Sequence, residues 1–395
     1  MSRRAVPKAN PEALLRGGTA VSRQAASPGP GPVRTRRAAI RPLLAPARIR
    51  ESFSVAAPPS LRNAAVAGMQ TSLSVLIVVA ATHLSPWAHL EGYPALGALA
   101  ALFGRFAPAR RRMPIVALAG LLLTAPVGLL SAVSMAGAAP VIMLLCLALL
   151  AGVLSVLVNR WGIGAPGVVI FVFAGCAAVG PVDSWRTVVE RSAFTAAGAA
   201  VAWWICRASD SLRCGSELPV ATAAVSARPA LHAGIAGARV ALCAATAALL
   251  ALAAGWAHPA WAAIGATAVM QGTHLHLTVQ RAVQRTVGTV IGAGLAWLFL
   301  ANHPTFWWVL LAVVLLQFAT ELVIGFNYVF GLICVTPMAL LMTSLAAPHA
   351  TGGMPMARVL DTVLGALVGV AFALLFSTLD DRTQLAAHHE KARAG

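Results

Sequence analysis

The stretch Gln280–Leu300 reads QRAVQRTVGTVIGAGLAWLFL and combines two arginines, closely spaced glycines and a long apolar run. Gly288 and Gly292 lie on one helix face, and this small-xxx-small spacing lets a second membrane helix approach closely. Arg285 precedes Gly288 by three residues, so its side chain starts on nearly the same face. A cation beside a tight helix contact in a membrane is costly unless it has a partner or a function. The stretch therefore predicts a membrane helix with a charged, closely packed head.

The whole chain has the composition of a polytopic helical membrane protein. Of its 395 residues, 59% are hydrophobic and only 10% are charged, and apolar runs of membrane-spanning length recur from Leu61 to Leu379. The net charge of +17 would suit a nucleic-acid-binding protein. However, most arginines outside the first 59 residues flank apolar runs, which is the pattern of membrane topology. We therefore expect the lipid bilayer as a partner and no nucleic acid.

The apolar segments form two groups of six, a first membrane repeat at 60–206 and a second at 230–379. A polar linker at 207–229 joins them, and a tail follows at 380–395. The sequence predicts the twelve segments at roughly 61–82, 92–107, 113–134, 138–158, 163–181, 186–206, 230–255, 258–273, 283–301, 305–324, 327–346 and 357–378. Segments 92–107 and 258–273 are short for a full span, so a re-entrant path is the alternative for them.

Residues 1–59 carry 11 basic residues against Glu12 and Glu51, and they contain the run SPGPGP. This composition predicts a disordered basic arm that is held at the cytoplasmic face by anionic lipid. The arm lacks the apolar core of a secretory signal. An organellar transit peptide has a similar composition and stays an alternative.

Similar residues recur in the two groups at an offset of roughly 165 to 173 residues, which indicates a duplicated unit. The matched pairs are Tyr93-Pro94-Ala95 with His258-Pro259-Ala260, Arg110–Arg112 with Arg281 and Arg285, and Glu190-Arg191 … Gly198 with Arg358 … Asp361 … Gly365. Arginines gather in alternate loops, so the positive-inside rule places both termini in the cytoplasm. The predicted fold is an all-α membrane protein of about twelve helices, built as two parallel six-helix repeats.

The second repeat resembles the fusaric acid resistance protein-like, or aromatic acid exporter, family of bacterial inner-membrane proteins. The resemblance rests on His258-Pro259-Ala260-Trp261, on Arg285-Thr286-Val287-Gly288-Thr289-Val290-Ile291-Gly292, and on the later run from Asn327-Tyr328 through Thr336-Pro337 to Arg358-Val359-Leu360-Asp361-Thr362 and Gly365. It covers about 230–378 well and 60–206 weakly, since Arg112 is not followed by the Gly-Thr element. The large cytoplasmic domains of many family members have no counterpart in the short linker and tail.

The resemblance implies export of small, often aromatic, carboxylic acids from the bacterial cell, driven by the proton gradient. Plant anion channels that release malate are distantly similar, so an organic-anion channel on the same scaffold is the first alternative. A non-transporting membrane component of envelope assembly, with arginines that bind lipid headgroups, is the second. We expect a small organic acid as substrate, and a homo-oligomer and a periplasmic adaptor protein are further candidate partners.

Five residues of the second repeat are candidates for substrate binding. Arg285 can capture a carboxylate through its guanidinium, and Arg239 lies deeper in its own apolar segment, where a lone charge needs a partner. Trp261, Asn327 and Tyr328 are candidates because they belong to the family motifs. The alternative for both arginines is anchoring at the membrane surface, and the alternative for Trp261 is a place in the aromatic belt.

Carboxylates in membrane helices commonly relay protons, so Glu321, Asp361 and Glu190 are the proton-coupling candidates. Glu321 is also expected to be a partner for Arg285 or Arg239. Arg358 and Asp361 are three residues apart and can form an ion pair on one helix face, with a purely structural role as the alternative.

The predicted helix-packing motif consists of Gly288, Thr289, Gly292 and Gly365. We expect Gly288 and Gly292 to pack against a helix of the other repeat and to form a moving seam. The six cysteines form no CxxC pair, so neither a metal site nor a disulfide framework is expected. No Walker A motif or catalytic constellation is present, so we expect no cofactor and no enzymatic activity.

Overall fold

The computed structural model describes residues 52–53, 60–105, 107–213, 230–271, 275–346 and 353–376. Most of the predicted basic arm, the linker residues 214–229 and the predicted tail lie outside the described residues. We call 60–213 the first half and 230–376 the second half. Every regular element within the described residues is a helix, which confirms the all-helical fold class.

The first half contains three short 3-10 helices beside its α-helices. In chain order its elements are α3 (Leu61–His83), η2 (Ala88–Leu90), α4 (Gly92–Ala98), η3 (Leu99–Leu102), α5 (Ala109–Met135), α6 (Pro140–Trp161), α7 (Val168–Ala177), α8 (Trp185–Ala208) and η4 (Asp210–Leu212). The second half contains α9 (Ala230–Ala253), α10 (Pro259–Met270), α11 (Leu275–Leu300), α12 (Phe306–Val323), α13 (Tyr328–Ala346) and α14 (Met354–Leu375).

Local sequence signals begin several of these helices. The Ser60 hydroxyl accepts a hydrogen bond from the Asn63 amide at the start of α3, and the Ser184 hydroxyl accepts one from the Thr187 amide at the start of α8. These contacts satisfy amide groups that have no partner within the helix. Pro residues occupy the first turns of α6, α10 and α14, where the missing N–H costs nothing.

Eight of the described helices are long and apolar enough to cross a membrane, namely α3, α5, α6, α9, α11, α12, α13 and α14. Three apolar helices are shorter, at Gly92–Leu102, Val168–Ala177 and Pro259–Met270. The second and eighth predicted segments are therefore short, as their sequences indicate. The fifth segment is also short, because Gly162, Gly164 and Gly167 adopt positive φ and keep residues 162–167 out of the helix.

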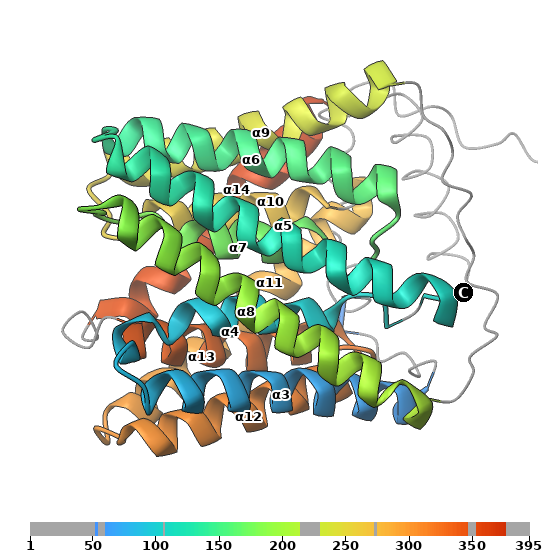
Figure 1. Cartoon of the computed structure of the whole chain (residues 1–395). Coiled ribbons are helices and arrows are strands. Elements are labelled where there is room, and N and C mark those ends of the chain that lie inside the picture. The colour runs from blue at the N-terminus through green and yellow to red at the C-terminus, as the bar shows by residue number, and fades with distance from the viewer. Residues whose placement is uncertain are drawn as a thin grey trace, which may run out of the picture.

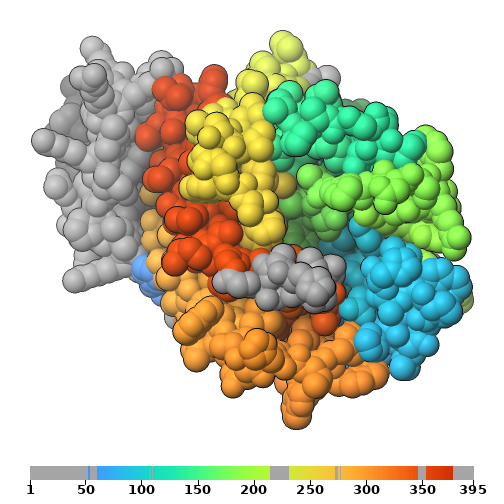
Figure 2. Space-filling view, turned by 90° about the vertical axis from the view of Figure 1, so that its left-hand side faces the viewer, coloured from blue at the N-terminus to red at the C-terminus, as the bar shows by residue number. Residues whose placement is uncertain are grey.

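The helices lie side by side along one main direction (Figure 1). An end view shows the blue-to-green first half toward one side and the yellow-to-red second half toward the other (Figure 2). The halves meet where α6 packs against α9 and where α3 packs against α12. Within the halves, α4 packs against α8 and α10 packs against α14, while α11 contacts both α13 and α14.

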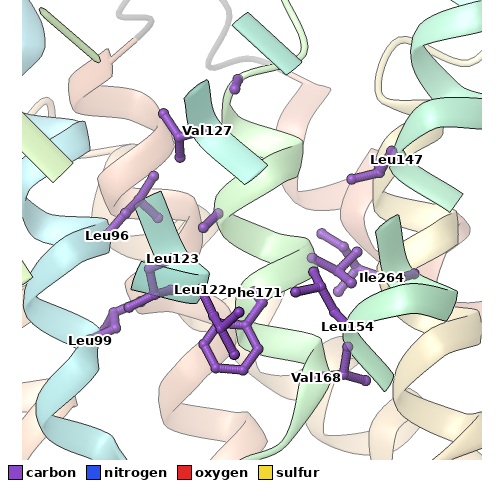
Figure 3. Close-up of a cluster of buried hydrophobic side chains, with 14 of the residues drawn as sticks. Leu96, Leu99, Leu122, Leu123, Val127, Leu147, Leu154, Val168, Phe171 and Ile264 are labelled. Carbon is purple, nitrogen blue, oxygen red and sulfur yellow. The ribbon is translucent and has the colours of Figure 1, made fainter. Parts of the chain in front are cut away.

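The interior of the bundle is filled by aliphatic and aromatic side chains from both halves. In Figure 3, Leu96, Leu123 and Phe171 of the first half share one cluster with Ile264 of α10. The Phe171 ring also stacks on the Phe103 ring, with their centroids 4.8 Å apart. This shared core ties α10 to the first half.

Candidate functional site

Arg285 and Tyr328 meet next to the close contact between α11 and α13. A side chain at Gly288 would put its Cβ 2.6 Å from the Cβ of Leu332, and one at Gly292 would lie 2.8 Å from the Cβ of Thr336. The glycines thus let the two helix backbones approach, as small residues do in membrane bundles. The expected partner was a helix of the other repeat, but α13 belongs to the same half. A seam between the halves at these glycines was therefore a wrong prediction.

The close approach places the Arg285 guanidinium beside the first residue of α13. Its Nη1 donates to the hydroxyl of Tyr328 at 3.3 Å, and only 5% of the Arg285 surface is exposed. Its Nε is buried and has no hydrogen-bond partner among the described residues. A phenol is a weak partner for a full positive charge, so the guanidinium retains the capacity to bind an anion.

Arg358 and Asp361 lie on α14, and both are buried in the protein interior. The Arg358 guanidinium carbon stands 5.1 Å from the centre of the Trp261 ring, a cation–π arrangement. Both carboxylate oxygens of Asp361 are buried without a hydrogen-bond partner in the described part of the chain. The predicted direct ion pair between Arg358 and Asp361 is therefore not formed, because the guanidinium extends over the indole ring instead.

These two arrangements share one neighbourhood. Arg358 lies within electrostatic range of Arg285, Asp361 and Tyr328, and also of Cys176 on α7. We call Arg285, Tyr328, Trp261, Arg358 and Asp361 the interior cluster. It brings together α10, α11, α13 and α14 and holds two guanidinium groups against one carboxylate. Such an excess of positive charge in a low-dielectric interior favours the binding of an anion.

His258 stands next to the interior cluster, at the residue before α10. Its ring stacks on the Trp261 ring with centroids 4.2 Å apart. Burial and, secondarily, the charge of Arg358 hold the pKa of His258 below its usual value. The imidazole is therefore neutral at pH 7 and adds no further positive charge to the site.

Glu321 forms an ion pair with a residue of the first half. Its Oε2 accepts a hydrogen bond from Nη1 of Arg105 at 2.5 Å, and the carboxylate is buried. The expected partners were Arg285 or Arg239, and this pairing was wrong. The reason is tertiary: α12 packs against α3 of the first half, which brings Glu321 to the segment that precedes α5.

Arg239 and Glu190 also lie apart from the interior cluster. Arg239 is partly buried on α9, where its guanidinium carbon lies 5.8 Å from the centre of the Phe376 ring. Glu190 accepts a hydrogen bond from the exposed Arg186 at 2.8 Å, one turn earlier on α8. Arg191 instead faces the ring of Tyr93.

Asn327 is the residue before α13, and its side chain bonds to neighbouring groups. Its Oδ1 accepts a hydrogen bond from the Val329 amide at 2.8 Å and another from Gln284 at 3.4 Å. The remaining motif residues pack: Thr289 is buried on α11, and a Cβ on Gly365 would lie 2.4 Å from the carbonyl oxygen of Ala262 on α10.

A polar network in the first half escaped the sequence analysis. Arg112 forms an ion pair with Asp210 and donates to the side-chain oxygen of Gln70 at 2.6 Å, while Gln70 donates to the hydroxyl of Ser209. Burial, followed by the charge of Arg112, lowers the pKa of Arg213 to about 10, so it stays charged at neutral pH. Gln70 is an amide within α3, a helix long and apolar enough to cross a membrane, and this signal could have indicated a buried partner.

The described residues hold no group of three or more His, Cys, Asp or Glu side chains that could bind a metal ion. Five cysteines are free thiols, namely Cys146, Cys176, Cys206, Cys243 and Cys334. The chemistry that the interior cluster offers is therefore that of guanidinium, phenol, indole and carboxyl groups. Together these groups can bind an anion and an aromatic ring, and the carboxyl group can exchange a proton.

Comparison with known proteins connects this geometry to a family. Residues 243–372 match the family described as fusaric acid resistance protein-like, which confirms the resemblance over that span, and the whole interior cluster lies within it. The chain is 34% identical over 128 residues to YvaC, an uncharacterized membrane protein of Bacillus subtilis (strain 168). That match covers 32% of this chain, and the chain spans only 20% of the relative's length. No solved structure matches the chain.

Proposed function

We infer that this multi-pass membrane protein is a secondary transporter that exports small organic acids. Its residues 243–372 match the fusaric acid resistance protein-like family. We propose that it resides in the bacterial inner membrane and that its substrates are aromatic carboxylic acids or related toxic compounds. The observation that carries the proposal is the interior cluster, where two buried guanidinium groups share electrostatic range with a single carboxylate. An anionic substrate would supply the missing negative charge.

The roles of the cluster residues follow from their chemistry. The substrate carboxylate binds Arg285, whose only hydrogen bond within the described residues goes to a neutral phenol, and the substrate ring lies against Trp261. Arg358 provides the second positive charge. Asp361, a buried carboxyl group whose oxygens lack hydrogen-bond partners, takes up and releases the coupling proton. Glu321 is less suited to this role because it already pairs with Arg105.

The proposed transporter has a duplicated membrane architecture of twelve segments with both termini in the cytoplasm. Packing of α3 against α12 and of α6 against α9 supports the duplication, because these four helices would be equivalent in pairs. The pairs α4 with α8 and α10 with α14 support it in the same way. In this scheme the interior cluster belongs to the second repeat alone.

Proton coupling is tested by benzoate flux from proteoliposomes that contain the full chain. A pH gradient should drive benzoate movement, and an uncoupler should abolish it. Asp361→Asn should lose the response to the gradient, because an amide cannot carry the proton. Asp183→Asn, which alters an exposed carboxylate outside the cluster, is the matched control and should keep it.

Two outcomes would favour the alternatives. Flux that survives collapse of the pH gradient and follows the membrane potential would indicate an organic-anion channel on the same scaffold. A different result, in which Arg285→Ala leaves the transport of every tested acid unchanged but alters envelope integrity, would favour the envelope-assembly component.

A further inference from the structure

Two amide side chains converge on one backbone oxygen next to the interior cluster. Nε2 of Gln284 donates to the carbonyl oxygen of Ser52 at 2.7 Å, and Nδ2 of Asn327 donates to the same oxygen at 3.0 Å. Gln284 belongs to α11 and Asn327 precedes α13, so Ser52, far away in the sequence, is held where these two helices meet. We call Gln284 and Asn327 the amide clamp.

The amide clamp is buried and fixed in orientation. Exposed fractions are 6% for Gln284, 7% for Asn327 and 3% for Ser52. The Oδ1 of Asn327 accepts from the Val329 amide and from Gln284, so its amino group must point toward Ser52. Two preoriented N–H donors on a single oxygen form a site for a carbonyl or carboxylate oxygen, because such an oxygen has two lone pairs to accept them.

The clamp also adjoins an unsatisfied cation. Gln284 and Asn327 each immediately precede a member of the pair Arg285 and Tyr328, so the two pairs lie side by side at the same helix crossing. Nε of Arg285 is buried without a hydrogen-bond partner within the described residues. The Ser52 carbonyl gives the clamp an accepting oxygen, but it carries no full negative charge to compensate the guanidinium. A carboxylate would provide the accepting oxygen and the full negative charge together.

We propose that the amide clamp is the entry site for the carboxylate of an organic acid and that the Ser52 carbonyl occupies it as a competing internal ligand. Ser52 and the anion exclude one another, so arrival of the anion releases Ser52 before the carboxylate passes to Arg285. The inference rests on the proposed export of organic acids. It adds a site, Gln284 with Asn327, and an autoinhibitory contact that is relieved by substrate.

The test measures the rate at which N-ethylmaleimide labels a Ser52→Cys variant of the full chain in proteoliposomes, by mass spectrometry of the modified peptide. Buried at the clamp, residue 52 should react slowly. Saturating benzoate should raise the rate, whereas benzyl alcohol, which has the same ring without a carboxylate, should not. Two hydrogen bonds hold the carbonyl, so we expect an increase of roughly tenfold.

A second variant tests whether Gln284 holds Ser52 in place. Adding Gln284→Leu should raise the labelling rate without benzoate and remove the further effect of benzoate. Gln280→Leu, one helical turn earlier on α11, is the matched control and should leave the slow labelling unchanged. If Gln284→Leu does not raise the rate, the clamp does not hold Ser52 and the inference is overturned.

Benzoate flux in the same vesicles distinguishes this inference from the proposed function. Flux with no effect of benzoate on labelling overturns the competition and leaves the export function standing. Faster labelling without flux supports the anion site and contradicts export. Absence of both effects overturns both.

Discussion

Each half of the molecule has a buried arginine with different partners, Arg112 in the first turn of α5 and Arg285 in the interior of α11. Arg112 on α5 is neutralised by the carboxylate of Asp210 and donates a hydrogen bond to Gln70. Arg285 on α11 has only the hydroxyl of Tyr328 as a hydrogen-bond partner in the described part of the chain. A buried cation with a carboxylate is part of the fold, while one without a carboxylate can bind a mobile anion. Within the described residues, the buried arginine of α5 thus has a carboxylate partner and that of α11 has none.

The last helices of the two halves repeat this contrast. Arg191 of α8 faces the ring of Tyr93 and Arg358 of α14 faces the ring of Trp261, at 5.3 and 5.1 Å from the ring centres. The nearby acids differ, because Glu190 pairs with the exposed Arg186 whereas Asp361 is completely buried. Cation–aromatic packing is common to both halves, and a buried titratable carboxyl group occurs on the last helix of the second half.

The largest expected effect tests what the halves share. A Cβ on Gly198 would lie 2.0 Å from the carbonyl oxygen of Pro94, and one on Gly365 would lie 2.4 Å from that of Ala262. Backbone atoms cannot move aside as a side chain can, so Gly198→Ala and Gly365→Ala should each lower the free energy of unfolding by about 3 kcal/mol or more. Thermal unfolding of the purified variants measures this loss.

Gly294→Ala is the control for these two substitutions, because no atom lies within 4 Å of a Cβ at Gly294. It should match the wild type or be slightly more stable, since alanine favours the helix by about 1 kcal/mol over glycine. If only one of Gly198→Ala and Gly365→Ala is destabilising, the halves do not share the packing on which the comparison depends.

The second prediction separates the two arginines. Arg112→Met removes the partner of Asp210 and Gln70 and should reduce the free energy of unfolding by about 2 kcal/mol, less than a fully buried pair would lose because Asp210 is 30% exposed. Arg285→Met should leave stability nearly unchanged, because methionine removes a buried charge that has no carboxylate partner in the described chain. The same Arg285→Met variant should reduce benzoate flux at least about tenfold, the loss expected for one charge-assisted contact.

Thermal unfolding and benzoate flux are measured on both variants. The contrast is reversed if Arg112→Met reduces flux while stability is unchanged, or if Arg285→Met unfolds the protein. Arg112→Lys is a useful companion variant. It keeps the charge but loses the fork geometry that serves Asp210 and Gln70 together, so its stability should lie between those of the wild type and Arg112→Met.

The sequence predicts the helices and the small-residue spacing of α11, because both depend on residues close together along the chain. Gly288, Gly292 and Arg285 occupy one helix face by spacing alone. The ion pairs were missed because they join distant segments: Arg105 is 216 residues from Glu321, and Arg112 is 98 residues from Asp210. Which acid meets which arginine is decided by the packing of α12 on α3 and by the turn after α8, and neither has a local signature.

The predicted pair of Arg358 and Asp361 failed for a different physical reason. Spacing along a helix allows such a pair, but it does not exclude a competing partner from another helix. Trp261 is that competitor, and α10 brings its ring to the guanidinium because Gly365 lets α10 and α14 approach closely. A cation–π contact in a dry interior can replace a hydrogen bond to a carboxylate when the carboxylate itself is costly to keep charged.

The smallest expected effect concerns His258, which matches Tyr93 of the first half in the proposed repeat. Burial and then Arg358 lower the pKa of His258, so the folded protein binds a proton there less readily than the unfolded chain, whose histidine has a pKa near 6.5. The stability linked to this residue is therefore fully present above about pH 6.5 and is lost as the pH falls through the lower folded-state value.

His258→Tyr installs the residue of the first half, which does not titrate in this range, and should reduce the decline of Tm between pH 7 and pH 5. Glu91, whose pKa is raised by burial, contributes equally to both proteins, so the difference between the two Tm profiles isolates His258. Identical profiles would mean that burial and the Arg358 charge do not lower the pKa of His258 in the folded protein, and the contrast between the halves would then rest on Arg285 and Asp361 alone.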